Sequence, residues 1–216
     1  MAAIGASHNN KLRTRSRLPH MLLAWYLLCW IVTAIDPVDR KDWMLENILA
    51  IALVVGLVVS YRRFNFSNLS YVLLALFMTL HAIGAHYTYA QVPAGFWLQD
   101  VFHLSRNPFD RIAHFSYGLL LVLPIRELLV RFGGVQGPWA YGLAVCVILA
   151  KSGLFEVLES IVAEMVSPEL GSAYLGMQGD EWDAQKDMAC ALAGAILTTG
   201  FVLAFAKIKP TWHHSP

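Results

Sequence analysis

Long apolar blocks alternate with short polar segments along almost the whole chain. There are six such blocks, and each approaches the about 20 residues that a helix needs to cross a hydrocarbon core roughly 30 Å thick. Backbone polar groups in lipid must be satisfied within their own segment, which favours helices over strands. The pattern predicts an all-α polytopic transmembrane helix bundle of about six spans, over residues 18–35, 43–61, 69–90, 111–130, 138–163 and 187–206.

Composition and length support a single membrane domain. Of the 216 residues, 57% are hydrophobic and 14% are charged, whereas average soluble domains have about 45–50% and about 25%. We expect a basic segment over 1–17, a transmembrane domain over 18–206 and a short tail over 207–216. The net charge of +1 argues against a nucleic-acid partner, because that interaction depends on strong positive charge.

The first apolar block has a second interpretation, as a cleaved signal peptide. It follows a basic segment, and Val32-Thr33-Ala34 resembles a cleavage site. Five more apolar blocks follow, however, and removal of the first would leave an odd number of spans. We therefore expect the first helix to be retained.

The distribution of Lys and Arg predicts the orientation, because these residues collect on the cytoplasmic side of membrane proteins. With the N-terminus inside, ten basic residues face the cytoplasm: Lys11, Arg13, Arg15, Arg17, Arg62, Arg63, Arg126, Arg131, Lys207 and Lys209. Five face the outside: Arg40, Lys41, Arg106, Arg111 and Lys186. Lys151 falls near the middle of the fifth block. We predict that both termini are cytoplasmic.

Ionisable residues gather near the predicted outer end of three blocks. Residues of one helix face recur every three or four positions, and three groups follow that spacing: Asp110 with His114, then Glu156 with Glu159 between Ser152 and Ser160, then Asp180 with Asp183 and Asp187. A rise of about 1.5 Å per residue places the three groups at one depth. Ionisable residues in spans are candidates for function, and we expect these groups to converge.

Structural roles are open for several of these residues. Asp110 and Asp180 could cap helices, and Glu156 with Glu159 could belong to an ion-pair network with Lys151 or Arg111. The segment 171–180, rich in glycine, could form a lid over the cluster or simply connect two helices. His81 and His86 are about 140° apart on a helix, so one of them is expected to serve packing.

The polar motifs resemble those of a known family. They are Asp110-Arg111-Ile-Ala-His114-Phe115-Ser-Tyr-Gly118, Glu156-Val-Leu-Glu159-Ser160, Gly179-Asp180-Glu-Trp-Asp183-Ala-Gln-Lys-Asp187 and Gly194. With them the chain resembles, over nearly all its length, the YjdF-like bacterial inner-membrane proteins, a family of uncharacterised function. A more distant similarity is to VanZ-like proteins, which also begin a membrane helix with an acidic-basic-x-x-His-Phe motif. The resemblance implies a location in the bacterial inner membrane, surrounded by lipid.

The leading functional hypothesis is a divalent-metal site of an enzyme that acts on lipid or envelope substrates. Carboxylates with one or two histidines suit Mg, Mn or Zn. We expect four ligands, Asp110, His114, Glu156 and Asp187, with Glu159 or Asp183 as general base. The cysteines Cys29, Cys146 and Cys190 form no CxxC pair and are not expected to bind metal. Two alternatives are a proton- or ion-coupled transporter and a non-catalytic membrane assembly or envelope factor. The sequence gives no indication of oligomeric state.

Overall fold

The computed structural model describes residues 16–208, and within this range it is entirely helical with connecting turns. Nearly all of the predicted terminal segments, 1–17 and 207–216, lie outside the described residues. Eight helices follow one another: α1 (Leu18–Thr33), α2 (Arg40–Ser60), α3 (Asn68–His86), α4 (Pro93–Phe102), α5 (Phe109–Arg131), α6 (Pro138–Met165), α7 (Pro168–Leu175) and α8 (Asp183–Ile208).

The expected all-α bundle of about six spans is confirmed. Helices α2, α3, α5 and α8 are each long and apolar enough to cross a membrane, and α1 is a shorter apolar helix of 16 residues. Helix α6 has 28 residues, a length of about 42 Å, which exceeds the bilayer core. Many large apolar side chains point outward from the bundle, among them Trp25, Ile51 and Phe201. Such exposure is expected of a lipid-facing surface.

Several boundaries differ from those that the apolar pattern predicts. Helix α3 ends at His86 instead of continuing to residue 90, because Thr88 and Tyr89 have positive φ angles of 53° and 50° that no helix continues. Helix α8 begins at Asp183, four residues before the predicted span. The short helices α4 and α7 occupy segments that we expected to be loops.

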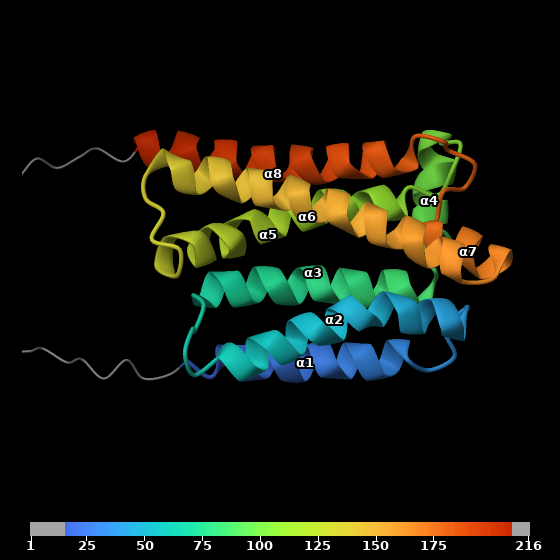
Figure 1. Cartoon of the computed structure of the whole chain (residues 1–216), viewed down its shortest axis with the longest axis horizontal. Helices are drawn as coiled ribbons and strands as arrows, with labels where there is room; N and C mark the ends of the chain where they lie inside the picture. The colour runs from blue at the N-terminus through green and yellow to red at the C-terminus, as the bar shows by residue number, and fades with distance from the viewer. Residues whose placement is uncertain (1–15, 209–216) are drawn as a thin grey trace, which may run out of the picture.

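The bundle has two halves that meet between α3 and α5 (Figure 1). Helices α1, α2 and α3 form one half, and α5, α6 and α8 form the other. The short helices α4 and α7 lie together at one end of the bundle, which we call the α4–α7 end. Helix α1 begins, and α8 finishes, at the opposite end. Because α2, α5 and α8 all begin at the α4–α7 end, their first turns are brought to the same depth.

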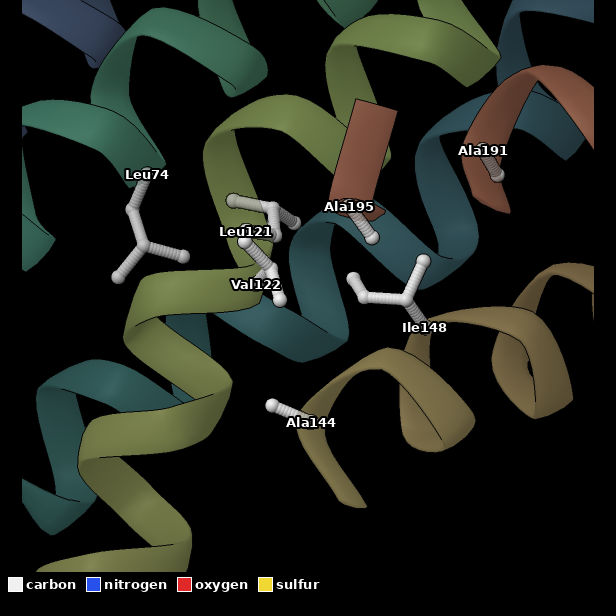
Figure 2. Packing of buried hydrophobic residues seen from close by; sticks show 7 residues of the cluster. All are labelled: Leu74, Leu121, Val122, Ala144, Ile148, Ala191 and Ala195. Carbon is white, nitrogen blue, oxygen red and sulfur yellow. The ribbon is translucent and has the colours of Figure 1, made fainter. Parts of the chain in front are cut away.

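A dry core of small and branched side chains joins the α5–α6–α8 half to α3. Figure 2 shows its seven buried members, Leu74, Leu121, Val122, Ala144, Ile148, Ala191 and Ala195. The alanines let the helices approach closely, as small residues do at membrane helix interfaces. This packing holds α5 and α8 in fixed register just below the polar end of the bundle.

The opposite end is held by a separate polar contact between α3 and α5. Glu127 of α5 accepts hydrogen bonds from the Ser67 backbone N–H at 2.8 Å and from the hydroxyls of Ser67 and Ser70. Arg131 forms an ion pair with the same carboxylate. These partners satisfy Glu127 completely, so it serves the fold and not a binding site.

Candidate metal site

The start of α5 supplies two of the predicted ligands. Asn107 fixes this start: it is fully buried, its side-chain oxygen accepts a hydrogen bond from Phe109 N–H at 3.0 Å, and its side-chain amide donates to Val92 O at 3.0 Å. One turn further, Asp110 and His114 lie on the same face of α5. Their Oδ1 and Nε2 atoms are 3.7 Å apart.

Helices α6 and α8 bring the other two predicted ligands close to this pair. Ligand atoms of Asp110, His114 and Asp187 all lie within 4.8 Å of one another. Glu156 Oε1 lies 3.7 Å from His114 Nε2. A distance of 3.7 Å is too long for a hydrogen bond, but ligand atoms at about 2.1 Å from one ion are themselves about 3–4 Å apart. The spacing of Asp110, His114 and Asp187 thus suits a cation, and Glu156 approaches this group at His114.

Two oxygens of this cluster are buried without a hydrogen-bond partner among the described residues. They are Glu156 Oε1 and Asp187 Oδ1, and the Asp187 side chain is only 2% exposed. A buried carboxylate oxygen without a partner is costly, and the cost is removed when a proton or a cation is bound.

The predicted general base Glu159 lies beside this cluster. It is buried on α6, and its carboxyl group is within hydrogen-bonding reach of Glu156, one turn away. Lys151, which the sequence offered as a partner, is exposed on the outer face of α6 and forms no salt bridge in the described part of the chain. Ser160 is also exposed, and it donates to Val157 O on its own helix. Of the predicted stripe on α6, only Ser152, Glu156 and Glu159 face inward.

The other candidate base, Asp183, is held by two arginines. It forms an ion pair with Arg106, and Arg111 Nη2 lies 3.5 Å from its Oδ1. Arg111 also pairs with Asp180, to which Lys186 Nζ donates at 2.7 and 2.8 Å. The hydrogen bond from Lys186 lowers the pKa of Asp180 to about 2, so the Asp180 carboxylate stays charged at physiological pH.

The connection between α7 and α8 closes over the site through the same arginine. Arg106 donates to Gly176 O and Met177 O, both at 3.0 Å. The Gln178 side chain forms two hydrogen bonds with the Asn107 backbone: its oxygen accepts from Asn107 N–H at 3.0 Å, and its amide donates to Asn107 O at 3.1 Å. The segment 171–180 is therefore part helix and part cover, anchored to the start of α5.

The sequence analysis missed two acids on α2. Asp42 and Glu46 are 1% and 6% exposed, and they lie one turn apart on the inward face of the helix. Glu46 is near enough to Asp110 and Glu159 to interact with them electrostatically. A signal was present, because Glu46 interrupts the predicted apolar block over 43–61 and Asp42 precedes Glu46 by four residues, which is helical spacing.

The two histidines of α3 have different surroundings, as their angular separation on the helix predicts. His86 Nδ1 lies 2.9 Å from Thr33 O and ties α3 to the end of α1. His81 Nδ1 pairs with the Tyr89 hydroxyl, and its buried Nε2 has no partner within the described residues. His86 thus serves packing, while His81 lies on the inner side.

Comparison with known proteins agrees with the resemblance seen in the motifs. The chain is 40% identical over 179 residues to "Inner membrane protein YjdF" of Escherichia coli (strain K12), covering 82% of this chain and 85% of that protein. No solved structure matches. A family model described as "Predicted membrane protein (DUF2238)" matches residues 18–207, which include every candidate ligand named above. The chain therefore belongs to this family of membrane proteins, DUF2238.

Proposed function

We propose that this protein binds a divalent cation at the α4–α7 end of the bundle, with Asp110, His114, Glu156 and Asp187 as its ligands. One observation carries the proposal: ligand atoms of Asp110, His114 and Asp187 lie within 4.8 Å of one another, and Glu156 Oε1 lies 3.7 Å from His114 Nε2. One imidazole among carboxylates suits Mn or Zn, and the carboxylates suit Mg.

The residues around this site fit hydrolytic or transfer chemistry on a phosphoryl or carbonyl group. A bound cation would polarise such a group and acidify a water. Glu159, buried beside Glu156 and unpaired with any Lys or Arg of the described chain, is placed to accept a proton from that water. Asp183 is occupied by its arginines, so we assign it to holding the cover and give the role of base to Glu159.

The location suggests the class of substrate. The site lies at the membrane-interface end of a bundle whose outer surface faces lipid, and the E. coli relative is named as an inner-membrane protein. We therefore propose an inner-membrane enzyme that acts on a phospholipid or a lipid-linked envelope precursor.

Ion-coupled transport has less support. Ionisable residues within membrane spans mark ion and proton pathways, but among the described residues the acids without a Lys or Arg partner gather at the α4–α7 end. Between them and Glu127 lies the apolar core of Figure 2.

Metal binding is the decisive test. Purified protein, freed of metal by chelator, is titrated with Mn²⁺, Zn²⁺ and Mg²⁺ while its melting temperature is followed. We expect at least one ion to raise the melting temperature, because binding to the native state stabilises it. His114→Ala and Glu156→Gln are expected to abolish the rise but still fold in chelator. Glu164→Gln, an exposed acid further along α6, should behave like the wild type. A wild-type protein that shows neither bound metal nor a thermal shift would favour a non-catalytic assembly role.

A further inference from the structure

The acid pair of α2 remains without an assigned partner. Both carboxylate oxygens of Asp42 and Oε2 of Glu46 are buried and lack a hydrogen-bond partner among the described residues. The polar neighbour Asn47 is occupied, since it accepts from Trp30 Nε1 at 2.6 Å and donates to Trp43 O at 2.7 Å. Asn47 therefore does not supply a hydrogen bond to these three oxygens.

Electrostatic contacts place this pair next to the first cluster. Glu46 interacts with Asp42 and with Asp110, and Glu159 interacts with Glu46, Glu156 and Asp110. Glu159 thus interacts with acids of both groups. The acids form one continuous group that spans both halves of the bundle.

Two tyrosines close the α2 side of this group. Tyr89 and Tyr174 both interact electrostatically with Asp42, Glu46 and Glu159. Burial raises the pKa of each hydroxyl above its usual value, so both stay protonated and can donate hydrogen bonds but cannot supply an anionic ligand.

The α4–α7 end holds more acids than basic partners. Arg106 and Arg111 form salt bridges with Asp110, Asp180 and Asp183, and no salt bridge in the described residues joins a Lys or Arg to the remaining acids. Those are Asp42, Glu46, Glu156, Glu159 and Asp187. Each buried carboxylate of this set needs a proton or a cation to offset its charge, and a single divalent cation offsets two negative charges.

We propose that Asp42 and Glu46 hold a second divalent cation beside the first, with Glu159 between the two ions. This inference rests on the proposed function. An all-oxygen pair selects a hard ion such as Mg²⁺ or Mn²⁺, whereas the His114 site also accepts Zn²⁺. Two adjacent cations would bind both the attacking and the leaving oxygen of a phosphoryl substrate, which narrows the substrate class to phosphate esters or anhydrides.

Stoichiometry with Mn²⁺ tests the second site on the full-length protein in detergent. We expect two Mn²⁺ per chain for the wild type by equilibrium dialysis and metal analysis. The double variant Asp42→Asn/Glu46→Gln should retain one, because its amides match the carboxylates in size and leave the His114 site intact. Glu164→Gln, the exposed acid of α6, is the matched control and should retain two.

A spectroscopic measurement on the wild-type protein tests the second site without relying on the folding of a variant. Electron paramagnetic resonance of the Mn²⁺-loaded wild type should show an exchange-coupled pair instead of the six-line spectrum of isolated ions. A wild type that binds one Mn²⁺ with an isolated-ion spectrum, lost in His114→Ala, overturns the second site and leaves the proposed function standing. A wild type that binds none overturns both. An unchanged stoichiometry in the double variant also overturns the assignment to α2.

Discussion

At the scale of single residues, the polar end of this protein separates acids that have basic partners from acids that have none. Asp180 and Asp183 are neutralised by Arg111, Arg106 and Lys186. Glu159 and Asp187, at similar depth, have no Lys or Arg partner in the described part of the chain. The sequence shows the charges but not this division, because partners such as Arg106 and Asp183 lie 77 positions apart. For that reason the sequence could not separate Asp183 from Glu159 as the general base, and the two arginines beside Asp183 support our proposal that it anchors the cover.

Arg106→Ala tests the anchor. The change leaves Asp183 buried with only the longer contact to Arg111, and it removes both hydrogen bonds to the cover. Breaking one partner of a buried ion pair typically costs about 3–5 kcal/mol, so we expect a marked fall in the denaturation midpoint in detergent. Arg62→Ala, an exposed arginine, is the control. Adding Asp183→Asn to Arg106→Ala should restore part of the loss, and equal destabilisation by Arg62→Ala and Arg106→Ala would contradict the assignment.

At the scale of helices, the apolar blocks predicted the long elements well because each block has to match the bilayer thickness. Short elements carry no such signal: α4 and α7 have 10 and 8 residues, and their pattern is compatible with a loop. Asp42 and Glu46 escaped notice for a related reason. They lie in the first two turns of α2, where acids are ordinarily explained by capping and the helix dipole. Only the packing of α2 against α7 shows that they point inward.

The close approach of α5 and α8 sets the distance between ligands on the two helices. A Cβ on Gly118 would lie 1.8 Å from Ala191 O, so Gly118→Ala must push the helices apart. Overpacking typically costs about 1–3 kcal/mol, and the same shift separates Asp110 and His114 from Asp187. We therefore expect both a lower melting temperature and weaker metal binding.

Gly142→Ala on α6 is the matched control for that change, because no atom lies within 4 Å of the added Cβ. It should leave metal binding unchanged and stabilise the helix slightly through its better helix propensity. If Gly118→Ala lowered stability without weakening metal binding, the ligands would not depend on the α5–α8 distance.

At the scale of the whole molecule, polar chemistry is concentrated at one end of the bundle. The buried acids, the cover and the short helices all occupy the α4–α7 end (Figure 1), while the described chain begins and finishes at the other. Both described ends on one side require an even number of crossings, as in the six-span interpretation. The orientation of the bundle in the membrane therefore decides on which side the site opens. It also decides from which side a substrate must come.

Cysteine labelling in cells tests that orientation. The end predicted to be cytoplasmic carries ten basic residues, and the opposite end carries five. Of those five, Arg106, Arg111 and Lys186 form salt bridges with acids. In a variant with Cys29, Cys146 and Cys190 replaced by Ala, exposed Ala94 and Ser172 mark the α4–α7 end and exposed Gln136 the opposite end. We expect Ala94→Cys and Ser172→Cys to react with a membrane-impermeant maleimide in intact spheroplasts, and Gln136→Cys to react only after lysis. The reverse pattern would place the acidic site on the cytoplasmic side, where a substrate from the outer leaflet or the envelope could not reach it.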